Sequence, residues 1–111
     1  MERDTARAAK EIDVRVKFMH PVWQEHSLEY GTAHSAGLDL RACIDGPELI
    51  IPAGERAAVP AGLAIEIREP GIAGFIFSRS GLGTKEGLTV SQGVGVVDPD
   101  YRGEIIVSLL N

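Results

Sequence analysis

The sequence predicts an all-β domain, built as a β-sandwich or jelly-roll. Apolar side chains recur in short segments, several of which alternate apolar and polar residues as half-buried strands do. Clusters of proline, glycine and aspartate, which favour turns, separate nearly all of these segments. Since no segment with helical periodicity lies between them, a parallel α/β sheet is disfavoured.

The N-terminal part divides into a tail, a strand and a connection. Residues 1–11 carry alternating charges and alanines without an apolar face, so we expect a disordered tail or a short exposed helical turn. Residues 12–18 alternate between apolar and charged side chains and predict the first strand. It ends before Pro21, because proline cannot donate to a strand ladder. Residues 23–33 predict an irregular connection.

The remaining predicted strands are short and closely spaced. They cover Leu38–Cys43, Glu48–Ile51, Ala57–Val59, Leu63–Arg68, Gly74–Phe77, Leu88–Ser91, Gly93–Val97 and Glu104–Leu110. The turn signals between them include Asp45-Gly46-Pro47, Pro52-Ala53-Gly54, Pro60-Ala61-Gly62 and Glu69-Pro70-Gly71. The last strand is apolar on both faces, which predicts cover from both sides. We therefore expect oligomerisation, further chain beyond Asn111, or both.

Composition limits the functions that the chain can have. At 111 residues with 44% hydrophobic side chains, it is long enough for one domain with a modest core. Its net charge of −5 argues against sequence-independent nucleic-acid binding, although a local basic pocket could still bind a small anion. Cys43 is the single cysteine, so no intrachain disulfide forms, and we expect it to pack as a small hydrophobic residue. No apolar run has the length of a membrane span or a signal peptide, so the cytoplasm is the expected compartment.

The segment Gly95–Glu104 combines turn chemistry with reactive side chains. Apolar alternation leads into it and continues after it, which predicts a β-hairpin with Asp98 and Tyr101 at its tip. Taken alone, this segment is explained by common turn chemistry. Two blocks upstream, Ser35–Ala42 and Ser78–Leu88, change the interpretation because all three occur in one chain.

In order and spacing, these three blocks resemble the first three sequence motifs of the dUTP diphosphatase (dUTPase) family, from about Ile12 to Asn111. The resemblance implies a distorted jelly-roll of the dUTPase type, also called a β-clip, which assembles as a homotrimer. It also implies hydrolysis of dUTP to dUMP and pyrophosphate, which removes dUTP and supplies dUMP for thymidylate synthesis. Each site would be shared, with Arg79 and Asp98 of one site on different subunits.

The second block predicts an anion site. Arg79 and the Ser80 hydroxyl lie beside two glycines just after a strand, so backbone N–H groups and a guanidinium could converge on a phosphate. The resemblance implies that Arg79, Ser80 and Gly81 bind the triphosphate. In the first block, strand alternation turns Asp39 away from its leucine neighbours. The resemblance implies that Asp39 supports the site near the phosphates and the waters of bound Mg²⁺.

The third block carries the residue to which we assign the chemistry. Hydrolysis of a phosphoanhydride needs a positioned water, a carboxylate that accepts its proton, and a divalent cation that neutralises the phosphates. The resemblance implies that Asp98 orients the water that attacks the α-phosphorus and that it contacts the sugar 3′-OH. Asp100 is the weaker candidate, because the match falls on the first carboxylate of the pair.

The resemblance also implies how base and sugar are recognised. Tyr101 would lie against the deoxyribose, where a ribose 2′-hydroxyl would clash. The strand region of Gln92, Gly93 and Val97 would pair backbone groups with the edge of uracil. Cytosine presents the reverse pattern, and an unpaired buried group costs about 1–3 kcal/mol.

The chain departs from the family pattern in three places. Ser78 stands where the second motif usually has proline, and Gln92 stands where bacterial members often have asparagine; neither change removes a catalytic group. Family chains continue through a fourth motif, whose glutamine helps hold the catalytic water, and a glycine-rich fifth motif that closes over the nucleotide. Residues 12–111 are therefore expected to form a single dUTPase-like domain without these motifs, and the chain is expected to be a fragment.

A metal site made only of protein side chains is not expected. His20, His26 and His34 lack the spacing of a metal cage. The resemblance implies Mg²⁺, held mainly by substrate phosphates and water.

Two other functions stay open. The dCTP deaminases share the fold, but their catalytic glutamate would fall at Ser108, which argues against deamination. The alternative from a different class is a relative that binds deoxyuridine nucleotide or a protein partner without turnover. The intact Asp39, Asp98 and Tyr101 argue against it, and the short C-terminus argues for it.

Overall fold

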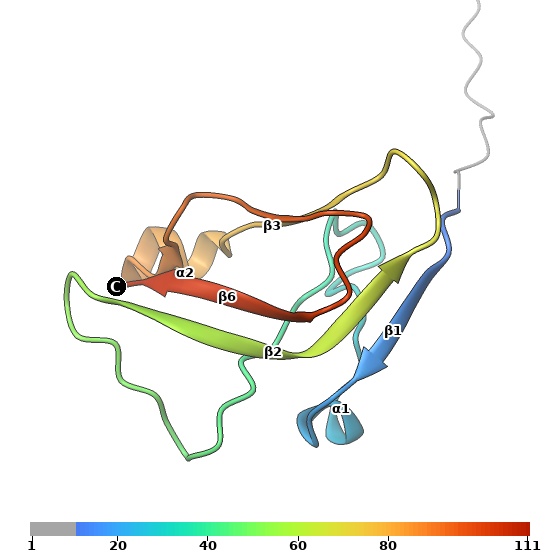
Figure 1. The fold of residues 1–111 in the computed structure, drawn as a ribbon. Coiled ribbons are helices and arrows are strands. Elements are labelled where there is room, and N and C mark those ends of the chain that lie inside the picture. Colours follow the sequence, from blue (N-terminus) through green and yellow to red (C-terminus); the bar gives the residue numbers. More distant parts are fainter. Residues whose placement is uncertain (1–10) are drawn as a thin grey trace, which may run out of the picture.

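The computed structural model describes residues 11–111 and places all the strands of this range in two antiparallel sheets (Figure 1). The larger sheet has the strand order β1-β2-β6-β4, and the smaller one pairs β3 with β5. In chain order the elements are β1 (Val14–Phe18), α1 (Val22–Glu25), β2 (Arg56–Ile67), β3 (Gly74–Ile76), α2 (Ser80–Glu86), β4 (Thr89–Val90), β5 (Gly95–Val97) and β6 (Glu104–Leu110). The predicted all-β class is confirmed. Of the tail predicted over 1–11, residues 1–10 lie outside the described residues, and Glu11 is exposed.

The long strand β2 replaces two shorter strands that the sequence predicts. Its first half pairs with β6 and its second half with β1, and the register shifts between Pro60 and Ala64 (Figure 1). The predicted turn at residues 60–62 is therefore wrong, because a bulge accommodates both the proline and the glycine within one strand. Gly62 has φ +67°, and a Cβ there would lie 2.6 Å from the Sγ of Cys43.

Two predicted strands, Leu38–Cys43 and Glu48–Ile51, do not form. Within the described chain, residues 38–43 make one isolated bridge, between Leu38 and Tyr30, and a hydrogen bond from Cys43 N to Pro60 O at 2.8 Å. Ile50 is 75% exposed. A strand needs a neighbouring backbone that completes a ladder, and the apolar pattern of these segments does not report whether one is present.

The helix α2 forms where the sequence predicts only a turn, so the expectation of no helical segment is wrong there. Two glycines within Ser80–Glu86 lower the helix propensity of this segment, so the sequence does not predict a helix there. The end of the helix is defined instead by Gly87, at φ +72°, whose N–H donates to the carbonyl of Gly83. The short helix α1 likewise overlaps the connection predicted over residues 23–33.

The core lies where the two sheets meet α1 and the loop that precedes β2. It is built from Trp23, Cys43, Ala61, Leu63, Val97 and Ile105. The indole Nε1 of Trp23 donates to the carbonyl of Ala61 at 2.9 Å, which satisfies its buried donor. Cys43 is 3% exposed, so its expected role as a packed hydrophobic residue is confirmed.

Part of the apolar surface of the sheets stays exposed. On β6, Ile105 is buried while its neighbour Ile106 is 55% exposed. Phe75 and Val96 face each other across the β3–β5 ladder and are 59% and 60% exposed. The last strand is thus only partly covered within this chain, as its sequence predicts. Among the elements of residues 11–111, no helix combines the length and apolarity that a membrane span requires.

Candidate active site

The first and second motifs meet at one end of the molecule. The Nε atom of Arg79 lies 3.9 Å from Oδ1 of Asp39, and the two side chains are 71% and 53% exposed. An ion pair this open to water contributes little to folding. Both charges therefore stay accessible to a ligand in solution.

Asp39 reaches this position on a loop, not on a strand face as its neighbours predict. Leu38 is exposed, so strand alternation does not decide the direction of Asp39. Instead the chain folds back through Gly31, where a Cβ would lie 3.4 Å from Oδ2 of Asp39. The turn is closed by Ser35, whose Oγ accepts a hydrogen bond from the Thr32 N–H at 2.9 Å.

Arg79 is positioned between β3 and α2. Its carbonyl accepts the Gly83 N–H at 2.9 Å, which begins the helix, and Ser80 and Gly81 form the exposed first turn. The first turn of a helix leaves its N–H groups without intrahelical acceptors. Immediately before Arg79, the Oγ of Ser78 accepts the Val90 N–H at 2.9 Å. This hydrogen bond attaches the turn before α2 to β4. The only feature of the sequence that could have predicted the bond is the hydroxyl of Ser78.

The connection from β4 to β5 brings Gln92 close to the smaller sheet. Gly93, at φ +89°, donates its N–H to Val90 O at 3.0 Å and closes a tight turn. Gln92 is exposed, and its Nε2 would lie 3.7 Å from a Cβ on Gly95. Val97 is 6% exposed and packs in the core, so only its backbone could contact a base.

The third motif is not the tip of a hairpin, so that prediction is wrong. β5 pairs with β3 while β6 pairs with β2 and β4, and residues 98–103 therefore cross from one sheet to the other. Alternating apolar residues report which face of a strand is buried but not which strand lies beside it. We call residues 98–103 the crossing loop.

Backbone hydrogen bonds hold the crossing loop. Tyr101 donates its N–H to Asp98 O at 3.0 Å, and its hydroxyl donates to Glu104 O at 2.7 Å. The Nη1 of Arg102 donates to Pro99 O at 2.7 Å. The carboxylates of Asp98 and Asp100 are exposed beside these bonds. The sequence analysis did not identify Arg102 as a residue of this site. Its position next to the predicted turn is the only feature of the sequence that could have indicated it.

An open cavity of about 620 Å³ lies beside the crossing loop. Its lining is Ile67, Arg68, Glu69, Pro70, Asp98, Pro99, Asp100 and Arg102. Charges of both signs face this space, and Asp98 is among them. Arg68 directly follows the last residue of β2 and belongs to none of the three motifs.

Arg79 and Asp98 of one chain are not brought together. In the β3–β5 ladder Ile76 pairs with Gly95 and Gly74 pairs with Val97. Arg79 lies beyond the end formed by Ile76 and Gly95, and Asp98 lies beyond the end formed by Gly74 and Val97. The two residues therefore lie past opposite ends of the small sheet. Figure 1 shows the same separation between α2 and the loop that leads into β6.

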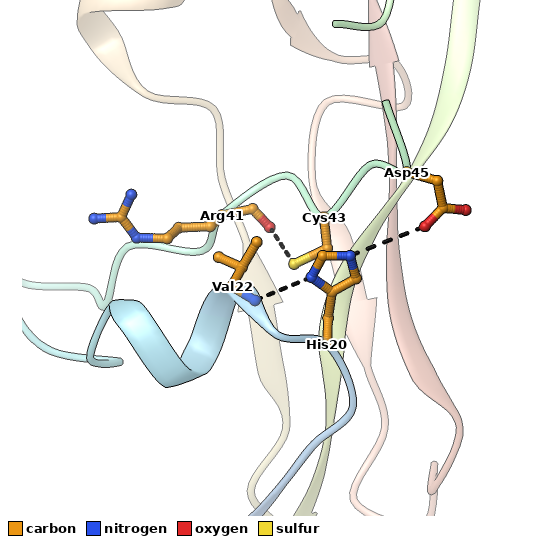
Figure 2. A network of polar contacts seen from close by, with 5 residues as sticks. All are labelled: His20, Val22, Arg41, Cys43 and Asp45. Carbon is orange, nitrogen blue, oxygen red and sulfur yellow. Dashed lines mark hydrogen bonds and ion pairs between the residues drawn. The ribbon is translucent and has the colours of Figure 1, made fainter. Parts of the chain in front are cut away.

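A second polar cluster combines a thiol, an imidazole and a carboxylate (Figure 2). The Nδ1 of His20 accepts the Val22 N–H at 3.1 Å, and Nε2 lies 4.0 Å from Oδ1 of Asp45. Cys43 donates to the carbonyl of Arg41 at 3.7 Å. Burial raises the pKa of the Cys43 thiol, and the negative charge of Glu104 raises it further. The thiol is therefore protonated and unreactive at neutral pH. The cluster joins His20, which lies between β1 and α1, to the start of α1 and to residues 41–45 of the following loop.

Within residues 11–111, no group of three or more His, Cys, Asp or Glu side chains is arranged to bind a metal ion directly. Asp39 offers an exposed carboxylate beside the guanidinium of Arg79. A hydrated Mg²⁺ that is bound through phosphates needs only such oxygen acceptors for its waters. The side chains at this end therefore fit a metal carried by the substrate.

Comparison with known proteins gives consistent results. A family model described as dUTPase matches residues 24–111. Proteins named deoxyuridine 5′-triphosphate nucleotidohydrolase from Azoarcus sp. and Janthinobacterium sp. are 46% and 49% identical over 98 residues, which are 88% of this chain and 65% of each relative. The chain thus spans less than two thirds of the length of these relatives.

Solved structures agree with the fold. A mutant dUTPase from phage phi11 of S. aureus, described with a structural Mg(II) ion, superposes with a TM-score of 0.74 at 23% identity over 89% of this chain and 60% of that one. The dUTPase from Streptococcus mutans gives a TM-score of 0.62 at 31% identity over 73% of this chain and 65% of that one. With its family match, its relatives and its fold in agreement, the chain belongs to the dUTPase family.

Proposed function

We propose that this chain hydrolyses dUTP to dUMP and pyrophosphate, and that Asp98 activates the attacking water. The observation that carries the proposal is the contact between Asp39 and Arg79 at the exposed N-terminus of α2, in a chain that belongs to the dUTPase family. The named activity of the bacterial relatives supports the same reaction. In a cell this reaction would remove dUTP and supply dUMP for thymidylate synthesis, with the cytoplasm as the proposed compartment.

The triphosphate binds at the Arg79 end. The guanidinium supplies a fixed positive charge with several donors, and the Ser80 hydroxyl and the N–H of Gly81 add donors from the helix start. Asp39 lies 3.9 Å from the guanidinium, and its exposed carboxylate can accept hydrogen bonds from the waters of a bound metal. The protein carries a net charge of −5, so binding of an anion depends on this local cation.

The reaction at phosphorus needs one proton acceptor. The oxygen of water forms a bond to the α-phosphorus while the bond from that phosphorus to the α,β-bridging oxygen breaks. Asp98 accepts the proton that water loses, and the leaving group departs as pyrophosphate. A hydrated Mg²⁺, which the phosphates would hold near Asp39, would supply positive charge that neutralises them. The carboxylate of Asp98 is exposed, so a water molecule can reach it.

Each site is shared between subunits of a homotrimer. Support comes from the positions of Arg79 and Asp98 past opposite ends of one small sheet, because a site shared between subunits would bring together residues that one chain holds apart. Exposed apolar side chains on both sheets, Phe75, Val96 and Ile106, offer the surface that subunit contacts would cover.

Base and sugar lie along β5 and the crossing loop. Backbone groups from Gln92 and Gly93 to Val97 pair with the edge of uracil, and the side chain of Gln92 lies beside them. Tyr101 packs against deoxyribose. A dCTP deaminase activity is disfavoured, because Ser108 forms a hydroxyl pair with Ser91 where deamination needs a carboxylate.

The test measures pyrophosphate release from dUTP with Mg²⁺ by the mass-verified chain. We expect turnover of dUTP but not of dCTP, dTTP or UTP, and loss of turnover in Asp98→Asn. Wild-type binding of dUTP without turnover would replace the proposal with a non-catalytic nucleotide-binding role. Turnover that survives Asp98→Asn would contradict the assignment of the base.

A further inference from the structure

The ring of Tyr101 packs over a residue that has no side chain. A Cβ placed on Gly103 would lie 2.6 Å from the Oη of Tyr101 and 2.8 Å from its Cζ. Both separations are shorter than van der Waals contact allows. Any residue larger than glycine at this position would therefore have to displace the phenol.

The backbone of Gly103 does not itself require glycine. The described glycines with positive φ are Gly54, Gly62, Gly71, Gly87 and Gly93. Gly103 is not among them, so its φ lies outside the left-handed region that favours glycine. The space that the phenol occupies is thus the reason for glycine at this position.

The phenol is also fixed at its far end. Its hydroxyl donates to Glu104 O at 2.7 Å, and Glu104 is the first residue of β6, in register with Ala64 of β2. The Tyr101 N–H donates to Asp98 O at 3.0 Å. One side chain thus connects the larger sheet to the loop that carries Asp98, while 44% of Tyr101 stays exposed to a ligand.

We propose that Gly103 is a positioning residue that sets the ring of Tyr101 where it separates 2′-deoxyribonucleotides from ribonucleotides. The inference rests on the proposed function, because Tyr101 must meet the sugar. A rigid ring rejects one additional hydroxyl only if it cannot move aside. Gly103 admits the ring to its position, and the bond to Glu104 holds it there.

The decisive variant is Gly103→Ala, compared with Gly46→Ala as a matched control. Gly46 has an ordinary φ, and a Cβ on it would meet only Glu48 O, at 3.9 Å. In the ligand-free chain, we expect nuclear Overhauser contacts between the Tyr101 ring protons and the α-protons of Gly103. We expect the corresponding contacts in Gly103→Ala to change as the ring moves away, with the rest of the spectrum preserved. A ring that stays in place overturns the inference whatever nucleotides do.

The second readout is selectivity. Calorimetry with the α,β-imido analogues of dUTP and UTP measures the ratio of their affinities. We expect this ratio to fall about two- to tenfold in Gly103→Ala, the factor that corresponds to one neutral hydrogen bond, and to stay unchanged in Gly46→Ala. Tyr101→Phe, which keeps the ring but loses its bond to Glu104, should lower the ratio by less.

The outcomes separate the two proposals. Wild-type protein that binds neither analogue contradicts the proposed function and with it the role in sugar selection, while the ring contacts still decide the placement of Tyr101. Wild-type selectivity that persists unchanged in both Gly103→Ala and Tyr101→Phe contradicts this inference alone.

Discussion

Arg79 and Asp39 lie 3.9 Å apart between Nε and Oδ1, although they belong to separate motifs of the sequence. The contact is exposed, so its purpose is not to stabilise the fold. It places a cation and an anion together, as the proposed binding of a phosphate chain and its hydrated metal requires.

Replacing Arg79 should weaken binding of the triphosphate without unfolding the chain. A charge-assisted hydrogen bond contributes about 1.5–3 kcal/mol, so Arg79→Ala should raise the Kd for dUTP about 10- to 100-fold. The affinity for deoxyuridine, which lacks phosphates, should stay the same. Calorimetry measures both, with the exposed Arg56→Ala as the control. An equal loss for dUTP and deoxyuridine would show that Arg79 acts on the fold.

Mixing two impaired variants should restore activity if sites are shared, provided that dUTP is kept well below the raised Kd of Arg79→Ala. Asp98→Asn removes the proposed base, and Arg79→Ala removes the proposed phosphate ligand. In a mixed trimer, some sites receive an intact Asp98 from one chain and an intact Arg79 from another. Random assembly of equal amounts should give about one quarter of the wild-type rate. The rate of pyrophosphate release after co-refolding measures this. Absence of any recovery, with trimers confirmed by sedimentation, would indicate sites within single subunits.

Gly62 should be the glycine least tolerant of substitution in β2. Its φ is +67°, and a Cβ would lie 2.6 Å from Cys43 Sγ and 2.7 Å from His20 Cβ. Gly62→Ala should lower the free energy of unfolding by about 2–4 kcal/mol, since backbone strain and overpacking add. Gly54→Ala is the matched control: its φ is +77° but nothing lies within 4 Å, so only the strain of about 1–2 kcal/mol remains. Urea denaturation compares them, and equal losses would refute the packing argument.

The Cys43 thiol should make stability depend on alkaline pH. Its pKa in the folded chain is raised from the ordinary 9.0, mainly by burial, so the folded state holds its proton more tightly than the unfolded state. The contribution is fully present below the unfolded pKa and is lost as pH rises through the folded pKa. Urea unfolding from pH 7 upward should show a steeper decline for wild type than for Cys43→Ala. Parallel curves would exclude a contribution from this thiol.

Ser78 should hold the turn that precedes α2 against β4. Ser78→Ala removes the acceptor of the Val90 N–H, and so would proline, the residue that usually stands there in the family. We expect a loss of about 1 kcal/mol in unfolding free energy and faster hydrogen exchange at the Val90 amide, whereas Ser78→Thr should preserve both. Unchanged exchange at Val90 in Ser78→Ala would contradict the role of this hydroxyl.

The order of the motifs, the all-β class and the packed state of Cys43 could be predicted from the sequence. These properties follow from local patterns, because side-chain alternation and turn residues act over a few neighbours. Local patterns also misled in particular places. The alternation around Asp98 predicts a hairpin, and the alternation around Asp39 predicts a strand, yet neither forms.

The sequence by itself determined which residues carry charge, which strands bury an apolar face and which family the three motifs resemble. Only the tertiary structure decided that β5 leaves β6 to pair with β3, that Asp39 contacts Arg79, and that Gly103 lies beneath the ring of Tyr101. The physical reason is that strand pairing and side-chain contacts depend on residues distant in sequence. An apolar pattern shows that a strand must pack against another part of the chain, but it does not show which part.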